Sequence, residues 1–66
     1  MRRYHFVYIS IVGRVVGSEV RALPTDEAAV AYARTDAGAA IGLEIWHGKD
    51  LVFAQGIRRA PVGADD

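Results

Sequence analysis

Apolar residues fall into four short segments with strand character, and an alanine-rich segment divides these into two pairs. Residues 4–12 and 15–23 form the first pair, and residues 43–47 and 51–55 form the second. Aromatic and β-branched side chains dominate the first segment, which contains neither Gly nor Pro. Because only short gaps containing glycine separate the members of each pair, each pair is predicted to form an antiparallel hairpin, with Gly48 in the second turn at positive φ.

The segment between the two hairpins predicts one helix, from Asp26 to about Ala40. Thr25 occupies the N-cap position, and the acidic side chains of Asp26 and Glu27 in the first turn favour the positive end of the helix dipole. Gly42 is the natural stop at the C-terminal end, and Gly38 offers an earlier one. Apolar residues at helical spacing form one stripe, which consists of Val30, Ala33, Ala37 and Ile41.

The order of these elements predicts an α+β fold of ββαββ type. We expect a four-stranded, mainly antiparallel sheet with one helix packed on one face, because this is the simplest compact arrangement of these elements. Residues 1–56 are expected to form the single domain, and residues 57–66 a flexible C-terminal tail, because the pattern is lost there. Period-two alternation assigns six strand residues to the face under the helix: Phe6, Tyr8, Leu43, Ile45, Val52 and Ala54.

The same alternation leaves a second apolar face. It consists of Val7, Ile9, Trp46, Leu51 and Phe53. Such a face is large for a monomer, because contiguous exposed apolar patches rarely exceed a few hundred Å². We therefore expect these residues to form an interface in a homodimer or with another protein, with Trp46 near its centre.

Length and composition support association. A chain of 66 residues buries only about 60% of the surface that its unfolded form exposes, so a small domain of this kind often gains stability by associating. It contains no cysteine, which excludes disulfides and thiolate metal sites and fits a reducing compartment. No apolar run is long enough for a membrane span or a signal-peptide core, so no membrane association and a cytoplasmic location are expected.

The residues that carry chemistry are few. His5 and His47 lie in or at the end of predicted strands, and two histidines with scattered carboxylates do not have the spacing of a zinc site. No Ser or Thr lies in a nucleophile-elbow context, and no glycine-rich loop precedes the helix to hold a phosphate. We therefore expect no catalytic residues, no cofactor and no metal, and predict that the protein is not an enzyme.

Several short motifs, in order, resemble those of a family of small bacterial proteins of unknown function. The matching segments are Tyr4-His5-Phe6, Gly13-Arg14, Asp26-Glu27-Ala28-Ala29, Glu44-Ile45-Trp46-His47-Gly48 and Leu51-Val52-Phe53-Ala54. The resemblance covers residues 4–54 and implies a ββαββ fold without implying any activity. The chain departs from the family in its first turn, which reads Ser10-Ile11-Val12-Gly13 where the family tends to be acidic and polar.

These observations favour a non-enzymatic protein-interaction module that self-associates through the second apolar face or through an edge strand. An alternative is a small nucleic-acid-binding protein that uses strand aromatics and the terminal arginines Arg2, Arg3, Arg58 and Arg59. Eight Lys and Arg balance eight Asp and Glu, so no net positive charge attracts a polyanion. A third, more remote alternative is a small-molecule or metal binder at a dimer interface.

Overall fold

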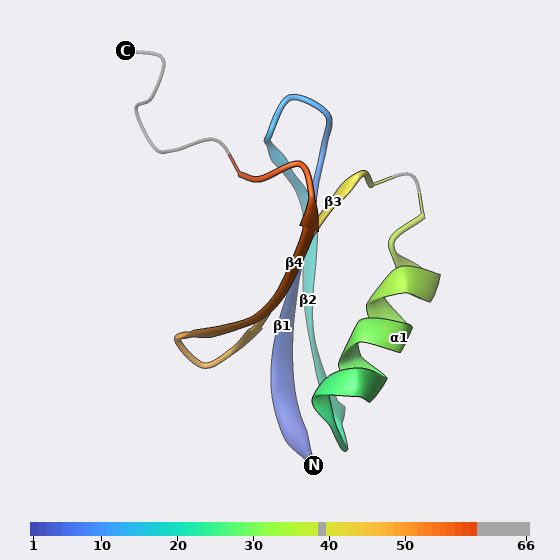
Figure 1. Cartoon of the computed structure of the whole chain (residues 1–66), viewed down its shortest axis with the longest axis vertical. Helices are drawn as coiled ribbons and strands as arrows, with labels where there is room; N and C mark the ends of the chain where they lie inside the picture. The colour runs from blue at the N-terminus through green and yellow to red at the C-terminus, as the bar shows by residue number, and fades with distance from the viewer. Residues whose placement is uncertain (39, 60–66) are drawn as a thin grey trace.

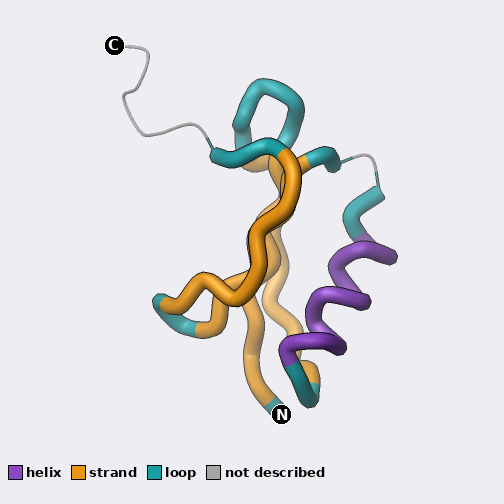
Figure 2. Tube along the Cα trace, viewed as in Figure 1, coloured by secondary structure: helices purple, strands orange, loops and turns teal. Residues whose placement is uncertain are grey.

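The computed structural model describes residues 1–38 and 40–59. One sheet and one helix make up the fold (Figures 1 and 2). The elements, in chain order, are β1 (Arg2–Ile9), β2 (Val15–Leu23), α1 (Asp26–Asp36), β3 (Gly42–His47) and β4 (Asp50–Gly56). The strand order in the sheet is β2-β1-β3-β4, with every neighbouring pair antiparallel, which confirms the predicted ββαββ fold.

The helix crosses one face of the sheet, which we call the helix face; the opposite face is the open face (Figure 1). β1 and β2 form the first hairpin, and α1 then returns the chain so that β3 pairs with the other side of β1. The two central strands therefore come from different halves of the sequence, with His5 opposite Trp46 and Tyr8 opposite Leu43.

The core lies between α1 and the two central strands. Its buried members are Tyr4, Phe6, Tyr8, Ala29, Ala33, Leu43 and Ile45. The Phe6 ring meets the helix residue Tyr32 edge-on, with 5.2 Å between ring centroids. Alanines on the buried side of the helix leave room for these aromatic strand residues, so the helix can lie close to the sheet.

Thr25 is the N-cap of α1, as predicted: its backbone is extended, and its Oγ1 accepts the N–H of Ala28 at 3.1 Å. The expected C-terminal end at about Ala40 is wrong, because the helix ends at Asp36 and Gly38 adopts a φ of 62°. The earlier glycine therefore stops the helix. As a result, Ile41 is not part of the helical stripe and is about half exposed.

The first strand is also shorter than expected, because the chain turns before Val12. The N–H of Gly13 bonds to the carbonyl of Ser10, and the N–H of Ser10 bonds to the carbonyl of Arg14. These bonds close a loop in which Ile11 and Val12 project outward, at 75% and 68% exposure. The glycine makes this turn possible with a φ of 83°.

A β-bulge in β4 corrects the predicted assignment of residues to faces. Ile45 pairs with Phe53 and Trp46 pairs with Leu51, so Val52 is an extra residue on β4. Strict alternation fails at that point, and both Val52 and Phe53 pack against the core on the helix face. Ala54 pairs with Glu44 and is exposed, so its predicted place under the helix is wrong.

Two glycines bring the chain back over the end of the sheet after β4. Gly42 pairs with Gly56, whose φ is 74°, and the N–H of Ile57 then bonds to the carbonyl of Ile41. A Cβ on Gly42 would lie 2.1 Å from the carbonyl oxygen of Ile57 and 2.9 Å from the Cβ of Ile9. The missing side chain therefore lets residues 57–59 pass close to the sheet on the side away from α1 (Figure 1).

Candidate functional site

The structure brings together four of the five residues predicted for the second apolar face. Val7, Ile9, Trp46 and Leu51 lie on the open face, whereas the bulge places Phe53 on the helix face. Phe53 lies beneath the Arg34 guanidinium, 5.6 Å from its ring centroid. Its predicted membership of the open face is therefore wrong.

The centre of the open face is already covered by the chain itself. Val7 is 4% exposed and Ile9 is fully buried. The Glu44 carboxylate accepts the indole N–H of Trp46 at 2.9 Å and lies 3.0 Å from the Arg59 guanidinium, which comes from the segment after β4. An interface centred on Val7 and Ile9 would therefore need this cover to move. Of the four predicted residues on this face, Leu51 is the most exposed, at 45%.

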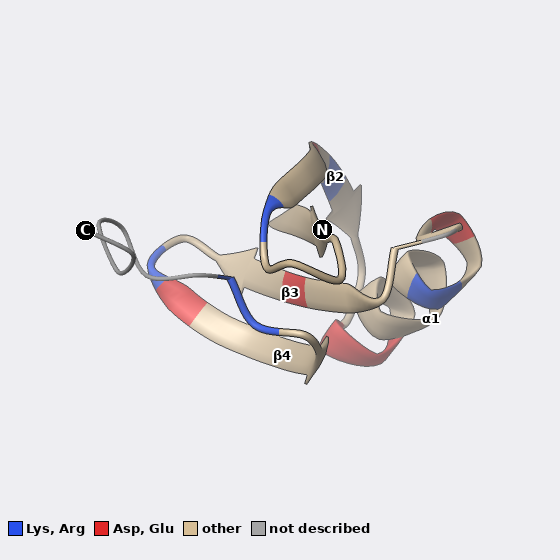
Figure 3. Ribbon diagram, turned by 90° about the horizontal axis from the view of Figure 1, so that it is seen from above, with Lys and Arg blue, Asp and Glu red and all other residues tan. Residues whose placement is uncertain are grey.

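Two of the four arginines proposed for nucleic-acid binding are paired with acidic side chains, and the strand aromatics near the N-terminus are buried. The Arg2 guanidinium lies 3.5 Å from the Asp26 carboxylate, and the Arg59 guanidinium is paired with Glu44. The strand aromatics Tyr4, Phe6 and Tyr8 are in the core under the helix, where no base can stack on them. On the ribbon, the positions of Lys and Arg are interspersed with those of Asp and Glu along the described elements (Figure 3).

The two histidines lie on opposite faces of the sheet. His5 lines a shallow hollow on the open face with Val7 and Trp46, whereas the ring of His47 lies 5.7 Å from the Tyr4 ring on the helix face. They therefore cannot share a metal ion. Within residues 1–38 and 40–59, no three His, Asp or Glu side chains are grouped as metal ligands, and no helix is long and apolar enough to cross a membrane.

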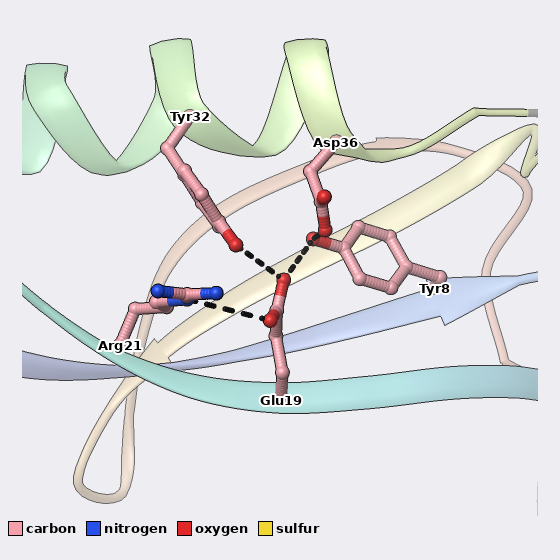
Figure 4. A network of polar contacts seen from close by, with 5 residues as sticks. All are labelled: Tyr8, Glu19, Arg21, Tyr32 and Asp36. Carbon is pink, nitrogen blue, oxygen red and sulfur yellow. Dashed lines mark hydrogen bonds and ion pairs between the residues drawn. The ribbon is translucent and has the colours of Figure 1, made fainter.

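A polar cluster that sequence reasoning missed connects β2 to the last turn of α1 (Figure 4). The Glu19 carboxylate accepts the hydroxyl of Tyr32 at 2.8 Å and that of Tyr8 at 3.3 Å. The Tyr8 hydroxyl also lies 3.1 Å from the Asp36 carboxylate, and the Arg21 guanidinium lies 3.5 Å from Glu19. The only sequence signal was the spacing of Glu19 and Arg21, which places both on one face of a strand.

The electrostatics of this cluster indicate a structural role. A hydrogen bond with the Asp36 carboxyl and a further one from Tyr32 lower the pKa of Glu19, whereas the bond with Glu19 raises the pKa of Asp36. Burial and the bond with Asp36 raise the pKa of Tyr8, so its phenol stays protonated and acts as a donor. The cluster therefore provides hydrogen bonds between strand and helix, and it offers no activated nucleophile.

Among the described residues, exposed large apolar side chains are most numerous along the first hairpin turn and the edge strand β2. We call this set the β2 patch; its residues are Ile11, Val12, Val15, Val16 and Val20, each between 48% and 75% exposed. β2 is an outer strand of the sheet, so one side of its backbone has no neighbouring strand within the described residues. The strand itself and association through an edge strand were predicted from the sequence, but none of these five residues was assigned to an interface.

Comparisons of the chain with protein-family models, curated proteins and solved structures find no match.

Proposed function

We propose that the protein is a non-enzymatic interaction module that binds another protein chain through the β2 patch and the adjacent edge of the sheet. The observation that carries this proposal is the exposure of five aliphatic side chains along a single turn and strand. Aliphatic side chains are usually buried, so five exposed ones along a single turn and strand point to a surface that another chain covers.

The backbone of β2 supports the same conclusion. An outer strand presents unpaired N–H and C=O groups, onto which an extended segment of a partner can add as a further strand. Proteins that avoid such pairing commonly place Lys or Pro on an exposed edge, and β2 contains neither. Backbone hydrogen bonds would then supply affinity, and the aliphatic side chains would add apolar burial.

The β2 patch replaces the centre of the open face as the binding surface. Val7 and Ile9 are already buried within the chain, so a partner gains little by covering them. Val15 and Val20 lie on the open-face side of β2, because they pair with Ile9 and His5. The proposed surface therefore adjoins the predicted one but is displaced to the edge of the sheet.

Affinity capture from cells that express the protein naturally tests this proposal, with the bound proteins quantified by mass spectrometry. Val20→Asp is expected to abolish capture of the specific partner, whether that partner is a second copy or a different protein, because Val20 is an exposed member of the β2 patch on the edge strand. Leu51→Asp is the matched control, because it adds the same charge at an exposed aliphatic residue on the opposite edge strand. Circular dichroism confirms that both variants are folded. Equal capture by Val20→Asp and wild type would contradict the proposal.

A further inference from the structure

The partner that β2 itself specifies is a second copy of the same chain. We propose that two β2 strands pair antiparallel about a two-fold axis at Val20, joining the two sheets edge to edge. This inference rests on the proposed function, because it names the occupant of the same surface. It is carried by the regularity of β2, by the order of charges along it and by the position of Val20.

The regular part of β2 is centred on Val20. Residues 17–23 pair one to one with β1, from Gly17 opposite Tyr8 to Leu23 opposite Arg2, and the bulge at Val16 lies outside this segment. The other outer strand, β4, has its bulge in the middle, at Val52. A straight, uninterrupted edge is the better template for another strand, because a bulge disrupts the ladder of hydrogen bonds. β2 is therefore the edge that favours pairing.

Symmetry restricts the possible registers. Two antiparallel edge strands are related by an axis perpendicular to the sheet, so both helices lie on the same face of the joined sheet. Residues that oppose one another must then come from the same face. With the axis at Val20, each Gly17 opposes Leu23 of the second copy, so the whole regular segment of both strands is paired. Moving the axis by one residue in either direction shortens this overlap.

Charge selects the same register. With the axis at Val20, Glu19 of each copy lies opposite Arg21 of the other, which gives two symmetric pairs of opposite charge. An axis at Glu19 would place two carboxylates opposite each other, and an axis at Arg21 would oppose two guanidiniums. The Arg21 side chain is 58% exposed and Glu19 is 28% exposed, so both are accessible to a second copy. Like charges that directly oppose one another destabilise a pair of strands.

Val20 lies at the proposed axis, so its side chain opposes Val20 of the second copy. Val20 lies on the open-face side of β2, since it pairs with His5, and is 51% exposed. In the proposed dimer it packs against Val20 of the second copy, and the contact buries an aliphatic surface that is exposed in the monomer. This identity of opposed residues gives a test that few other arrangements share.

Sedimentation equilibrium across a concentration series measures the effect of charges at the axis. Val20→Lys and Val20→Glu are each expected to raise the dimer dissociation constant by about tenfold or more, because each opposes two like charges. Mixing the two variants is expected to restore a dimer, since Lys then opposes Glu. Val15→Lys is the matched control, because it is an exposed valine on the same strand outside the paired segment. It is expected to weaken the dimer far less.

Cysteine cross-linking tests the register independently, because the chain has no native cysteine. Oxidation of Val20→Cys is expected to give a covalent dimer. Val15→Cys is expected to remain monomeric under the same conditions, since the two copies of residue 15 would lie about 34 Å apart along the strands. A dimer that Val20→Lys leaves unchanged would overturn this pairing. A monomer at all concentrations would also overturn it, and capture of a different protein that Val20→Asp abolishes would show that the proposed function survives.

Discussion

Replacement of Gly42 by alanine tests the close approach between the end of β4 and the sheet. The new Cβ would lie 2.1 Å from the carbonyl oxygen of Ile57, which is backbone and cannot rotate away as a flexible side chain would. It would also lie 2.9 Å from the Cβ of Ile9. Contacts this short are essentially never tolerated, so residues 57–59 must move away from the sheet.

The size of the effect follows from what the moved segment covers. Ile9 is fully buried, and full burial of an isoleucine side chain contributes about 1.5–3 kcal/mol. Forcing an added methyl into a packed site typically costs about 1–3 kcal/mol. The pair between Arg59 and Glu44 adds little, because about half of the Arg59 side chain is exposed and such pairs contribute at most about 1 kcal/mol. We expect Gly42→Ala to lower the free energy of unfolding by about 2 kcal/mol.

Urea denaturation followed by the fluorescence of Trp46 measures this loss, and two other glycines serve as controls. Gly17→Ala is expected to be neutral or to stabilise by up to about 1 kcal/mol, because its Cβ would lie an ordinary 3.7 Å from the Tyr8 ring. Gly48→Ala is expected to cost about 1–2 kcal/mol from its φ of 62° alone, since no atom lies within 4 Å. A free energy of unfolding for Gly42→Ala within about 0.5 kcal/mol of wild type would refute the reasoning.

Three further predictions concern the helix and its contacts. Thr25→Ala should lower the free energy of unfolding by about 1 kcal/mol in urea denaturation, because it removes the N-cap hydrogen bond. A loss of less than a few tenths of a kcal/mol would contradict the N-cap role of Thr25. Asp36→Asn should stabilise the protein at about pH 7 and have little effect at about pH 3. Glu19 raises the pKa of Asp36, so the contribution of this carboxyl group to stability is lost as the pH rises through that pKa. Denaturation midpoints at both pH values check this, and an equal effect at the two would count against it. Phe53→Ala should lower the free energy of unfolding by about 2 kcal/mol and Leu51→Ala by less than about 1 kcal/mol in urea denaturation, because the bulge packs Phe53 against the core. Equal losses for the two variants would contradict the assignment of these residues to opposite faces.

Much of the fold follows from local signals. The turn at Gly48, the N-cap at Thr25 and the two hairpins depend on residues close together in sequence, and the structure confirms them. The end of the helix was harder to predict, because both Gly38 and Gly42 can end a helix and the packing of the whole chain decides between them. Gly42 is needed elsewhere, beneath the carbonyl of Ile57.

The candidate surfaces were less predictable, because they depend on contacts between distant segments. Period-two alternation places Phe53 with Trp46 unless a bulge intervenes, and nothing in the local sequence marks Val52 as the extra residue. The same applies to Glu19, whose hydrogen-bond partners Tyr8 and Tyr32 lie 11 and 13 residues away. The β2 patch is exposed because β2 is an outer strand of the sheet, and the sequence pattern did not determine the order of the strands.

The position of β1 and β3 at the centre of the sheet has a consequence for the kinetics of folding. Their paired residues, such as His5 and Trp46, are about 40 residues apart in sequence, whereas each hairpin joins near neighbours. A two-stranded hairpin is at best marginally stable alone, so neither half is expected to persist before the other docks. Docking must close the long loop that contains the helix, an entropic cost that precedes any gain from the core. The rate of folding should therefore depend mainly on the pairing of β1 with β3. Substitutions in these two strands should slow folding more than equally destabilising substitutions in β4.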